Sequence, residues 1–405
     1  MQEYHIYCHI PYCKKRCKYC YFTAKFKEKE VIDLGNLDRY IAALEYDILN
    51  TDIPEGKLQS IVFGGGTPSL LSDDQLGIIM NAIHKKVSPD AFKSLEYIAY
   101  EVSPDTASYS TLSSFRKHGF NRISIGVQSF DDLELKLLGR PYKKSMIVQA
   151  MEDIRKLNYD LVNIDLLIGT PGQTMESAVQ SVRETIALRP EHISISLFYK
   201  SYPGGFEYVN SSLEQGYMLF TLEEKLQVYK QICELLKESG YLRVDNTVFS
   251  LPGHIFSYEK DSISGTRTVL AFGPGSSGYW QNTIRYTPPE IEKYIQKPES
   301  VCEEFSVETN AYATVWGHLN AYGYIVEEDI LKNFNLSTEQ LISQDESISK
   351  LVSNLKQYNC LEIKDGRYSL NRDKLDNAIV LMQHDKDERG YKLITASKER
   401  KEESK

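Results

Sequence analysis

Short apolar runs alternate, over the first 200 residues, with longer stretches in which apolar residues recur every three or four positions. The short runs predict β-strands at 3–10, 59–65, 94–102, 121–127, 161–169 and 192–199. The longer stretches predict amphipathic helices, for example at 37–49, 74–87 and 175–188. Strands this apolar are covered on both faces. The alternation therefore predicts an α/β fold, a partial (β/α)6 TIM-like barrel, with a doubly wound parallel sheet as the alternative.

After residue 215 the pattern changes. A long amphipathic helix is predicted at 222–241, a strand at 242–249 and a glycine-rich segment at 271–280. Further helices precede Asp365-Gly366, a pair that favours a tight hairpin turn. We predict a barrel core at 1–215, a barrel extension with the glycine-rich segment at 216–300, a small helical, winged-helix-like module at 301–385 and a charged tail at 386–405, whose last residues, ERKEESK, are expected to be solvated and disordered.

Chemically distinctive residues gather where the predicted strands end. In an α/β barrel the carboxyl ends of the strands form one rim, and that rim carries the active site. From the first strand to the sixth, the rim positions are Cys13, Cys17 and Cys20; Gly64, Gly65, Gly66 and Thr67; Glu101; Gln128; Asp165, within its strand; and Tyr199. We therefore expect these side chains to surround one site.

Composition excludes several classes of function. The 405 residues carry 47 Lys and Arg against 56 Asp and Glu, a net charge of −9. A general nucleic-acid binder or anionic-membrane binder is usually basic, so we expect neither partner. No apolar run reaches the roughly 18 residues of a transmembrane helix, and the first residues lack the pattern of a secretion signal. We expect a cytoplasmic protein.

Four of the seven cysteines lie within the first 20 residues. An odd number of cysteines without a secretion signal argues against a disulfide framework. Cys13, Cys17 and Cys20 form a CxxxCxxC motif. Three such thiols can form a zinc knuckle, serve as reduced structural cysteines, or bind three irons of a [4Fe–4S] cube whose fourth iron stays open. Packing roles are predicted for the other four: Cys8, Cys233, Cys302 and Cys360.

Four ordered blocks give the sequence a family resemblance. They read YCHIPYCKKRCKYCYF, VFGGGTPSLL, RISIGVQSFDD and NIDLLIGTPGQT. Together they resemble the radical S-adenosylmethionine (SAM) superfamily and, within it, the oxygen-independent coproporphyrinogen oxidase family, over about residues 4–280. The resemblance implies a [4Fe–4S] cluster on Cys13, Cys17 and Cys20, with SAM chelating the fourth iron. Reductive cleavage of SAM would then give a 5′-deoxyadenosyl radical.

The resemblance also assigns residues to two SAM molecules. Contacts to the first, cluster-bound molecule match Tyr7, Gly65 and Glu101, and Gly64 belongs to the same glycine turn. Contacts to the second match Tyr19, Gly66, Thr67, Gln128, Arg140 and Asp165, and Tyr199 is expected to bind cofactor at the end of its strand. Among these, Tyr19, Gln128 and Arg140 are the residues expected to take part in catalysis.

Three branches of the family compete. Coproporphyrinogen dehydrogenases usually carry a fourth cysteine where this chain has Phe22, and heme chaperones carry an HNxxYW segment that this chain lacks. The segment VLAFGPGSSGYW is closer to a glycine-rich block of heme-opening methyltransferases. On that ground the sequence favours methyl or methylene transfer (C-methylation or cyclopropanation) from the second SAM, with a heme chaperone or a coproporphyrinogen dehydrogenase-like protein as the alternative.

The partners follow from this chemistry. A one-electron donor such as flavodoxin or ferredoxin is expected, together with an organic substrate that is a tetrapyrrole, a ribosomal peptide or a natural product. A zinc-stabilised binding module is the non-enzymatic alternative that the cysteine spacing leaves open.

Overall fold

A computed structural model of the chain describes residues 3–20, 34–201, 205–256, 258, 268–280, 283–298, 303–306 and 311–389. Three features of the sequence prediction lie outside the described residues. They are Phe22 at the fourth-cysteine position, Cys302, and residues 390–405 of the predicted tail.

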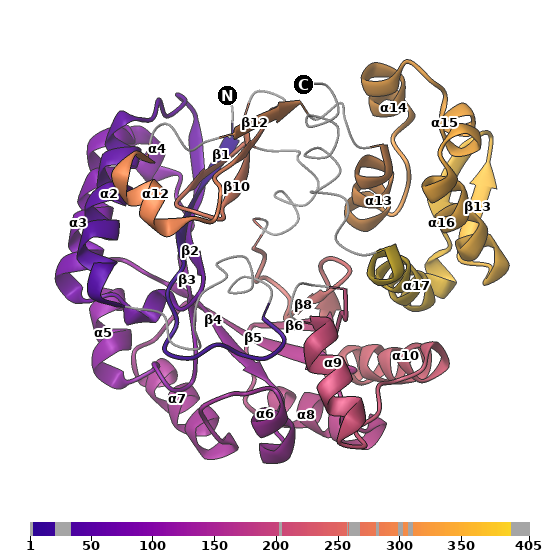
Figure 1. Cartoon of the computed structure of the whole chain (residues 1–405), viewed down its shortest axis with the longest axis horizontal. Helices are drawn as coiled ribbons and strands as arrows, with labels where there is room; N and C mark the ends of the chain where they lie inside the picture. The colour runs from indigo at the N-terminus through magenta and orange to yellow at the C-terminus, as the bar shows by residue number, and fades with distance from the viewer. Residues whose placement is uncertain are drawn as a thin grey trace.

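A nine-stranded sheet forms a curved wall, with strand order β7-β8-β6-β5-β4-β3-β2-β1-β9; its first strands are indigo to purple in Figure 1. The six central strands pair in parallel in chain order, which confirms the predicted partial barrel. The strands are β1 (Glu3–Ile10), β2 (Lys57–Gly65), β3 (Tyr97–Val102), β4 (Arg122–Gln128), β5 (Leu161–Ile168), β6 (His192–Leu197), β7 (Leu242–Arg243), β8 (Val248–Ser250) and β9 (Thr268–Phe272).

Helices cover the outer face of this wall (Figure 1), as the amphipathic stretches predict. They are α2 (Leu37–Asn50), α3 (Asp73–Lys86), α4 (Pro89–Lys93), α5 (Tyr109–Lys117), α6 (Asp132–Leu137), α7 (Lys144–Lys156), α8 (Met175–Ala187), α9 (Gly205–Glu214), α10 (Leu222–Glu238) and α12 (Ile291–Gln296). Local sequence starts several of them. Ser72 and Gln75 form a capping box at the start of α3, which satisfies amide groups that the first turn leaves without partners.

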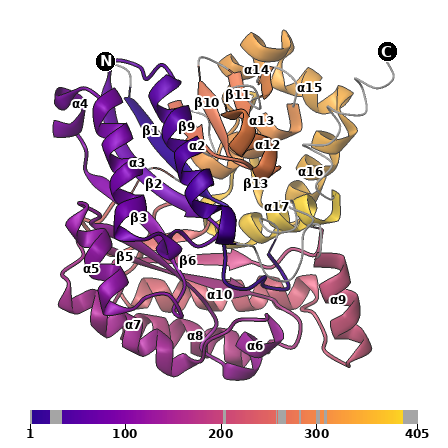
Figure 2. The same ribbon diagram turned by 60° about the vertical axis from the view of Figure 1, so that its left-hand side comes forward.

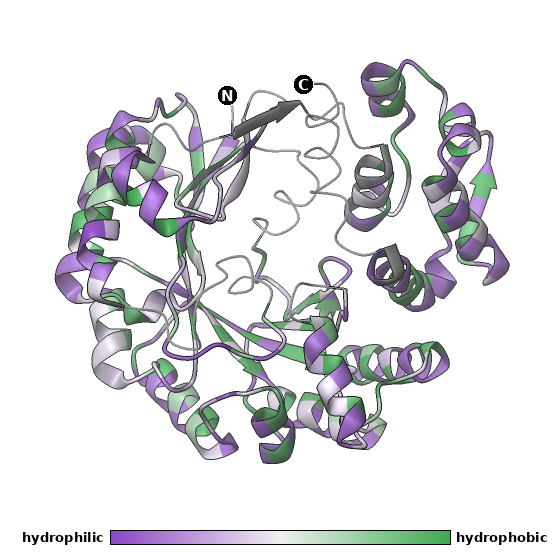
Figure 3. Ribbon diagram, viewed as in Figure 1, coloured by the Kyte–Doolittle hydropathy of each residue, from purple (hydrophilic) through white to green (hydrophobic). Residues whose placement is uncertain are grey.

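Strand alternation separates the core from the barrel interior. On β4, Ile123 and Ile125 belong to the main hydrophobic core beneath the helices, while Ser124 and Gly126 line a cavity on the inner face. Successive side chains of a strand point to opposite faces, so one strand serves both purposes. Figure 3 shows the result: the strands are mostly hydrophobic, whereas the helices turn hydrophilic residues outward.

The sheet extends beyond the six predicted strands at both edges. At one edge β9 pairs in parallel with β1, although the sequence indicates only a glycine-rich segment there. At the other edge the predicted strand 242–249 is divided into β7 and β8, which pair antiparallel with each other. Edge strands are short, and their pairing depends on long-range contacts that local periodicity does not report. A small antiparallel sheet follows, with β10 (Ser277–Trp280), β11 (Thr283–Tyr286) and β12 (Glu303–Ser306).

The C-terminal module has a hydrophobic core of its own, built from residues between Tyr312 and Met382. Its hairpin turns at Asp365 and Gly366, both with positive φ, as the sequence predicts. The elements are α13 (Ala311–Tyr322), α14 (Glu327–Phe334), α15 (Thr338–Gln344), α16 (Glu346–Gln357), β13 (Leu361–Lys364), β14 (Arg367–Leu370) and α17 (Leu375–Arg389). Figure 2 shows this module beside the barrel, above α10.

Helix α17 joins the two cores. Ile379 and Val380 pack into the barrel core, whereas Leu381 and Met382 pack into the core of the C-terminal module. A helix contacted from two sides needs apolar residues on both faces, so it lacks the single stripe that marks a surface helix. The helix continues to Arg389, so it passes the boundary that the sequence predicts between the module and the charged tail at residue 386. Asp387, inside that predicted tail, is buried and accepts the backbone N–H of Ser201 at 2.9 Å.

Polar contacts also fasten α17 to the barrel. The hydroxyl of Tyr199, just after β6, donates to Gln383, and the guanidinium of Arg243 on β7 pairs with Asp376. The Arg243 guanidinium lies 4.6 Å from the ring centre of Phe249. Among the described residues no helix has the length and apolarity to span a membrane.

Replacing Arg243 with Met tests whether this attachment stabilises the fold. The side chains of Arg243 and Asp376 are 18% and 31% exposed, so removing the cation leaves a carboxylate in a partly buried position. We expect the free energy of unfolding to fall by about 2 kcal/mol in urea denaturation followed by circular dichroism. Lys93→Met is the matched control, because its pair with Asp90 is exposed and such pairs contribute roughly 0–1 kcal/mol. Equal losses in both variants would contradict the role of Arg243.

Candidate active site

The cysteine loop (residues 11–20) follows β1 and is fixed to the turn after β2. The N–H of Gly66 donates to the Ile10 carbonyl at 2.8 Å, and the N–H of Thr67 donates to the Tyr12 carbonyl at 2.7 Å. The Thr67 hydroxyl approaches the Cys13 sulfur at 3.4 Å. These bonds continue the β1–β2 pairing past the strand ends. They therefore carry the cysteine motif directly onto the glycine turn.

The three glycines of that turn permit this close approach. A Cβ atom on Gly66 would lie 2.5 Å from the Tyr12 carbonyl oxygen and 2.7 Å from that of Ile10. A Cβ atom on Gly65, whose φ is +102°, would lie within 2.8 Å of three atoms of the His9 ring. Residues with a side chain rarely adopt the φ of Gly65, and a Cβ atom fits at neither Gly65 nor Gly66. Glycine is required at both positions because backbone and ring atoms already occupy the volume.

Two carboxylates, from the strands on either side of β4, line the same cavity as the glycine turn. Glu101 on β3 accepts the Gly65 N–H at 3.2 Å. Asp165 on β5 accepts bonds from Ser124 at 2.9 Å and Asn163 at 2.7 Å. Burial, followed by the charge of Asp165, raises the pKa of Glu101 to about 7, and burial also raises the pKa of Asp165. Two acids held so close in a recess suit a ligand that brings hydrogen-bond donors or positive charge.

The positively charged side chain of Arg140 also lines the cavity. Its guanidinium donates to the Tyr19 hydroxyl, from the cysteine loop, and lies 5.6 Å from the ring centre of Tyr142. Gln128 ends β4 with a φ of +69°, at a register shift in the pairing with β5. A side chain in that conformation is uncommon and marks a functional position in many proteins. The local bulge turns Gln128 toward the cavity.

These residues surround one cavity of about 420 Å³. Its lining includes most of the residues that the sequence places at the site: Cys13, Cys17, Tyr19, Cys20, Gly65, Gly66, Thr67, Glu101, Gln128, Arg140, Asp165 and Tyr199. Two others, Tyr7 and Gly64, do not line it. The Tyr7 hydroxyl contacts His9 at 3.1 Å, and a Cβ atom on Gly64 would lie 2.8 Å from Glu101.

Sequence reasoning missed several residues that line the cavity. Ser103, Asp105 and Thr106 come from the loop after β3, and Ser196 and Phe198 from the end of β6. The sequence contains a signal for Ser196. Polar residues alternate with apolar ones at His192, Ser194 and Ser196, on a strand that is buried among other elements. The loop residues had no such signal, because their position depends on how the loop folds back over the barrel.

Among the described residues no group of three or more His, Cys, Asp or Glu side chains is placed to hold one metal ion. Cys13, Cys17 and Cys20 nevertheless all line the same cavity.

Known proteins resemble the chain over this same region. The profile of the radical SAM superfamily matches residues 7–185. The heme chaperone HemW of Lactococcus lactis is 30% identical over 69% of this chain and 70% of its own length. HemW of Bacillus subtilis is 29% identical, with coverages of 71% and 74%.

This chain is a radical SAM protein of the family that contains HemW and the oxygen-independent coproporphyrinogen oxidases. The coproporphyrinogen III oxidase of Synechocystis is 31% identical over 61% of the chain and 52% of its own length. The structure of coproporphyrinogen III oxidase from Escherichia coli has the same fold, with a TM-score of 0.73 and 21% identity over 95% of this chain and 90% of that one. The resemblance to methyltransferases within the family finds no support among these relatives.

The cavity suits the cofactors of radical SAM proteins, a [4Fe–4S] cluster and SAM. Cys13, Cys17 and Cys20 supply three thiols at its edge, and the glycine turn leaves room for a ligand against backbone. Burial raises the pKa of Cys13 to about 12, so without metal that thiol holds its proton. Metal binding displaces such protons. We therefore expect cluster assembly to release protons and to favour neutral or alkaline conditions.

Gly66→Ala tests the glycine turn. Its Cβ would push the Ile10 and Tyr12 carbonyls away and shift the cysteine loop, and a misplacement of about 1 Å costs on the order of 100-fold in rate. We expect a loss of this size in 5′-deoxyadenosine release from SAM. Gly77→Ala is the matched control, because that Cβ meets only His118 at an ordinary 3.6 Å within helix α3. Full activity in Gly66→Ala would show that the turn does not position the cysteines.

Proposed function

We propose that this protein cleaves SAM reductively beside a tetrapyrrole ligand and abstracts a hydrogen atom from it. The observation that carries the proposal is the opening of the three thiols onto the same 420 Å³ cavity as the Glu101–Asp165 pair and Arg140. The relatives support the ligand class, since one group is named for heme and another for coproporphyrinogen. A cavity of that volume has room for SAM and part of a larger molecule.

In this proposal Cys13, Cys17 and Cys20 hold the cluster at the edge of the cavity. When bound, the cluster would supply one electron that splits SAM into methionine and a 5′-deoxyadenosyl radical. Transfer of a hydrogen atom from the ligand to that radical would give 5′-deoxyadenosine and leave a carbon-centred radical on the ligand. That electron comes from a donor protein such as flavodoxin or ferredoxin. The chain itself binds, orients and shields the reactants from water.

The polar residues hold the nucleoside and amino-acid parts of SAM. Glu101 accepts hydrogen bonds from ribose hydroxyls or an ammonium group, and the glycine turn presents backbone groups to the ligand. Tyr7 and Gly64 keep Glu101 in place. Charge-assisted bonds of this kind are about twice as strong as neutral ones, so they fix the orientation of the sulfonium.

Arg140, Asp165 and Gln128, with Tyr19 and Thr67, form the outer part of the cavity. We assign them to the carboxylate and ribose of a second SAM or to polar groups of the ligand itself. Methyl or methylene transfer from a second SAM is the less supported of these possibilities, because none of the relatives named above is a methyltransferase. Release of S-adenosylhomocysteine together with 5′-deoxyadenosine would favour that transfer.

Heme delivery is the second candidate function, and the HemW relatives favour it. The HNxxYW segment of heme chaperones is absent from this sequence. A Soret shift on adding hemin, followed by heme transfer to an acceptor protein without consumption of SAM, would support delivery over catalysis.

Cluster-dependent cleavage of SAM is the decisive test of the proposed function. After anaerobic reconstitution with iron and sulfide, dithionite should release 5′-deoxyadenosine, and Cys17→Ser should not, because one iron loses its thiolate. We expect coproporphyrinogen III or hemin to increase that release. Cys360→Ser is the matched control, since Cys360 is buried in the C-terminal module. A cluster-loaded protein that releases no 5′-deoxyadenosine would overturn the proposal.

The raised pKa of Glu101 predicts a pH dependence of SAM binding. With a pKa of about 7 the carboxyl is mostly protonated at pH 6 and mostly ionised at pH 8, and only the ionised form accepts bonds on both oxygens. The affinity for SAM should therefore increase by roughly tenfold from pH 6 to pH 8 in equilibrium dialysis. Glu101→Gln should bind more weakly at pH 8 and lose this dependence. An unchanged pH profile in that variant would assign the titration to another group.

A further inference from the structure

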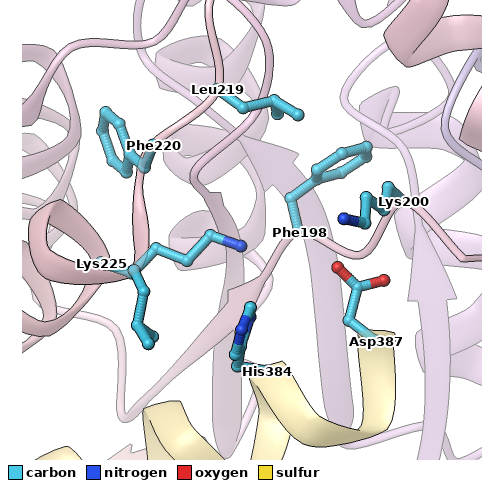
Figure 4. Close-up of a pocket in the computed structure, with 8 residues that line it drawn as sticks. Phe198, Lys200, Leu219, Phe220, Lys225, His384 and Asp387 are labelled. Carbon is cyan, nitrogen blue, oxygen red and sulfur yellow. The ribbon is translucent and has the colours of Figure 1, made fainter. Parts of the chain in front are cut away.

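A second, smaller cavity adjoins the main one on the side of the C-terminal module. It has a volume of about 90 Å³ and lies between the end of β6, the start of α10 and helix α17 (Figure 4). Its lining combines apolar and charged side chains: Phe198, Lys200, Leu219, Phe220, Leu222, Lys225, His384 and Asp387. We call it the lysine pocket.

The lysine pocket and the main cavity share one wall residue, Phe198. Its ring packs against Tyr208 in a small hydrophobic cluster with Leu138 and Leu167. The N–H of Phe198 donates to the Ile168 carbonyl at 2.8 Å, which extends the β5–β6 pairing and places the residue at the boundary of the two spaces. The two cavities are therefore adjacent, so one ligand that reaches past the Phe198 ring would contact both.

The basic groups of the lysine pocket come from three different elements. Figure 4 shows the Lys200 and Lys225 ammonium groups directed into the space from opposite walls, with the Asp387 carboxylate beside the Lys200 ammonium group and the His384 ring below that of Lys225. Both lysines are partly buried, so water does not fully screen them. The single acid in the lining, Asp387, also accepts the Ser201 N–H at 2.9 Å. Two ammonium groups against one carboxylate give the pocket an excess of positive charge.

Size and polarity together select the ligand group. A cavity needs roughly 10–15 Å³ to hold one water molecule, so 90 Å³ accepts a handful of non-hydrogen atoms and excludes a ring system. Leu219, Phe220 and Leu222 offer contact to methylene groups, while the two ammonium groups suit an anion. A short carboxyalkyl chain has both parts.

We propose that the lysine pocket binds a carboxylate side chain of the organic ligand, with Lys200 and Lys225 as its cationic contacts and His384 as a further donor. The ligand is then an amphipathic polycarboxylate, such as a tetrapyrrole with propionate groups, whose reacting part lies in the main cavity. This inference rests on the proposed function and names the feature of the substrate that the site recognises. It also gives α17 a role in binding, because His384 belongs to that helix.

Porphyrin binding to the full chain tests the proposal. Coproporphyrin III carries four propionates, and its tetramethyl ester has the same ring without their charge. Fluorescence titration of the anaerobically reconstituted protein with SAM should give tighter binding for the acid than for the ester. Lys200→Met and Lys225→Met should each weaken acid binding by about tenfold or more and leave ester binding unchanged. Lys225→Arg should restore most of the loss, because it restores the charge.

Lys230→Met is the matched control on the same helix. Lys230 is exposed and only distantly paired with Glu234, at 3.9 Å, so its loss should change neither titration. Circular dichroism of each variant checks its fold, and the comparison of acid with ester in the unaltered protein needs no variant.

The outcomes separate this inference from the proposed function. Equal binding of acid and ester, equal binding by the methionine variants and the unaltered protein, or no porphyrin binding at all would each overturn the lysine pocket as a carboxylate site. Release of 5′-deoxyadenosine, measured in the same preparation, judges SAM cleavage independently. Porphyrin binding with the expected discrimination but without 5′-deoxyadenosine would uphold the pocket and overturn the catalytic proposal.

Discussion

The parallel pairing of β1 with β2 is the constraint on which the rest of the site depends. It continues beyond the strands as two backbone bonds, from Gly66 to Ile10 and from Thr67 to Tyr12. Those bonds place the cysteine loop on the glycine turn, so the three thiols face the same cavity as the acids of β3 and β5. The glycines have no side chains because backbone and ring atoms from β1 and its loop already fill that volume. Both the packing of this turn and the access of a ligand to its backbone therefore require glycine.

Hydrogen bonds inside the barrel compensate for the burial of its polar side chains. Ser124 and Asn163 donate hydrogen bonds to Asp165, and these bonds favour its ionised form in this buried position. Asn163 in turn accepts a hydrogen bond from Ser194 at 3.0 Å. Such a network is costly when incomplete and rigid when satisfied. Here the donors come from three adjacent strands, so the sheet itself holds the carboxylate. Burial, followed by the charge of Asp165, raises the pKa of Glu101 to about 7, and the hydrogen bond from the Gly65 N–H offsets only part of this effect.

Helix α17 connects ligand recognition with domain packing. Its apolar residues belong to two hydrophobic cores, while Gln383, His384 and Asp387 face the barrel mouth at the end of β6. The C-terminal module is consequently fixed beside the cavity through contacts that also shape the lysine pocket. This arrangement accounts for the absence of a simple hydrophobic stripe in the helix, and for the acidic residues near its end that resemble a solvated tail in the sequence.

Local sequence determined the six central strands, the covering helices, the hairpin at Asp365-Gly366 and the cysteine motif. The reason is that the period of the apolar residues and the spacing within a motif depend only on residues that are close together in the chain. The motifs also identified the radical SAM superfamily, whereas the branch within the family was misjudged from a short glycine-rich segment that the relatives do not support. Only the tertiary structure decided the pairing of β9 with β1, the contribution of Ser103 and Phe198 to the cavity, and the meeting of Lys200, Lys225 and His384. Those contacts join residues up to 264 positions apart, as in the pairing of Tyr4 with Thr268, and no local pattern encodes such a distance. Folding brings them together because the helices and strands that carry them share buried cores.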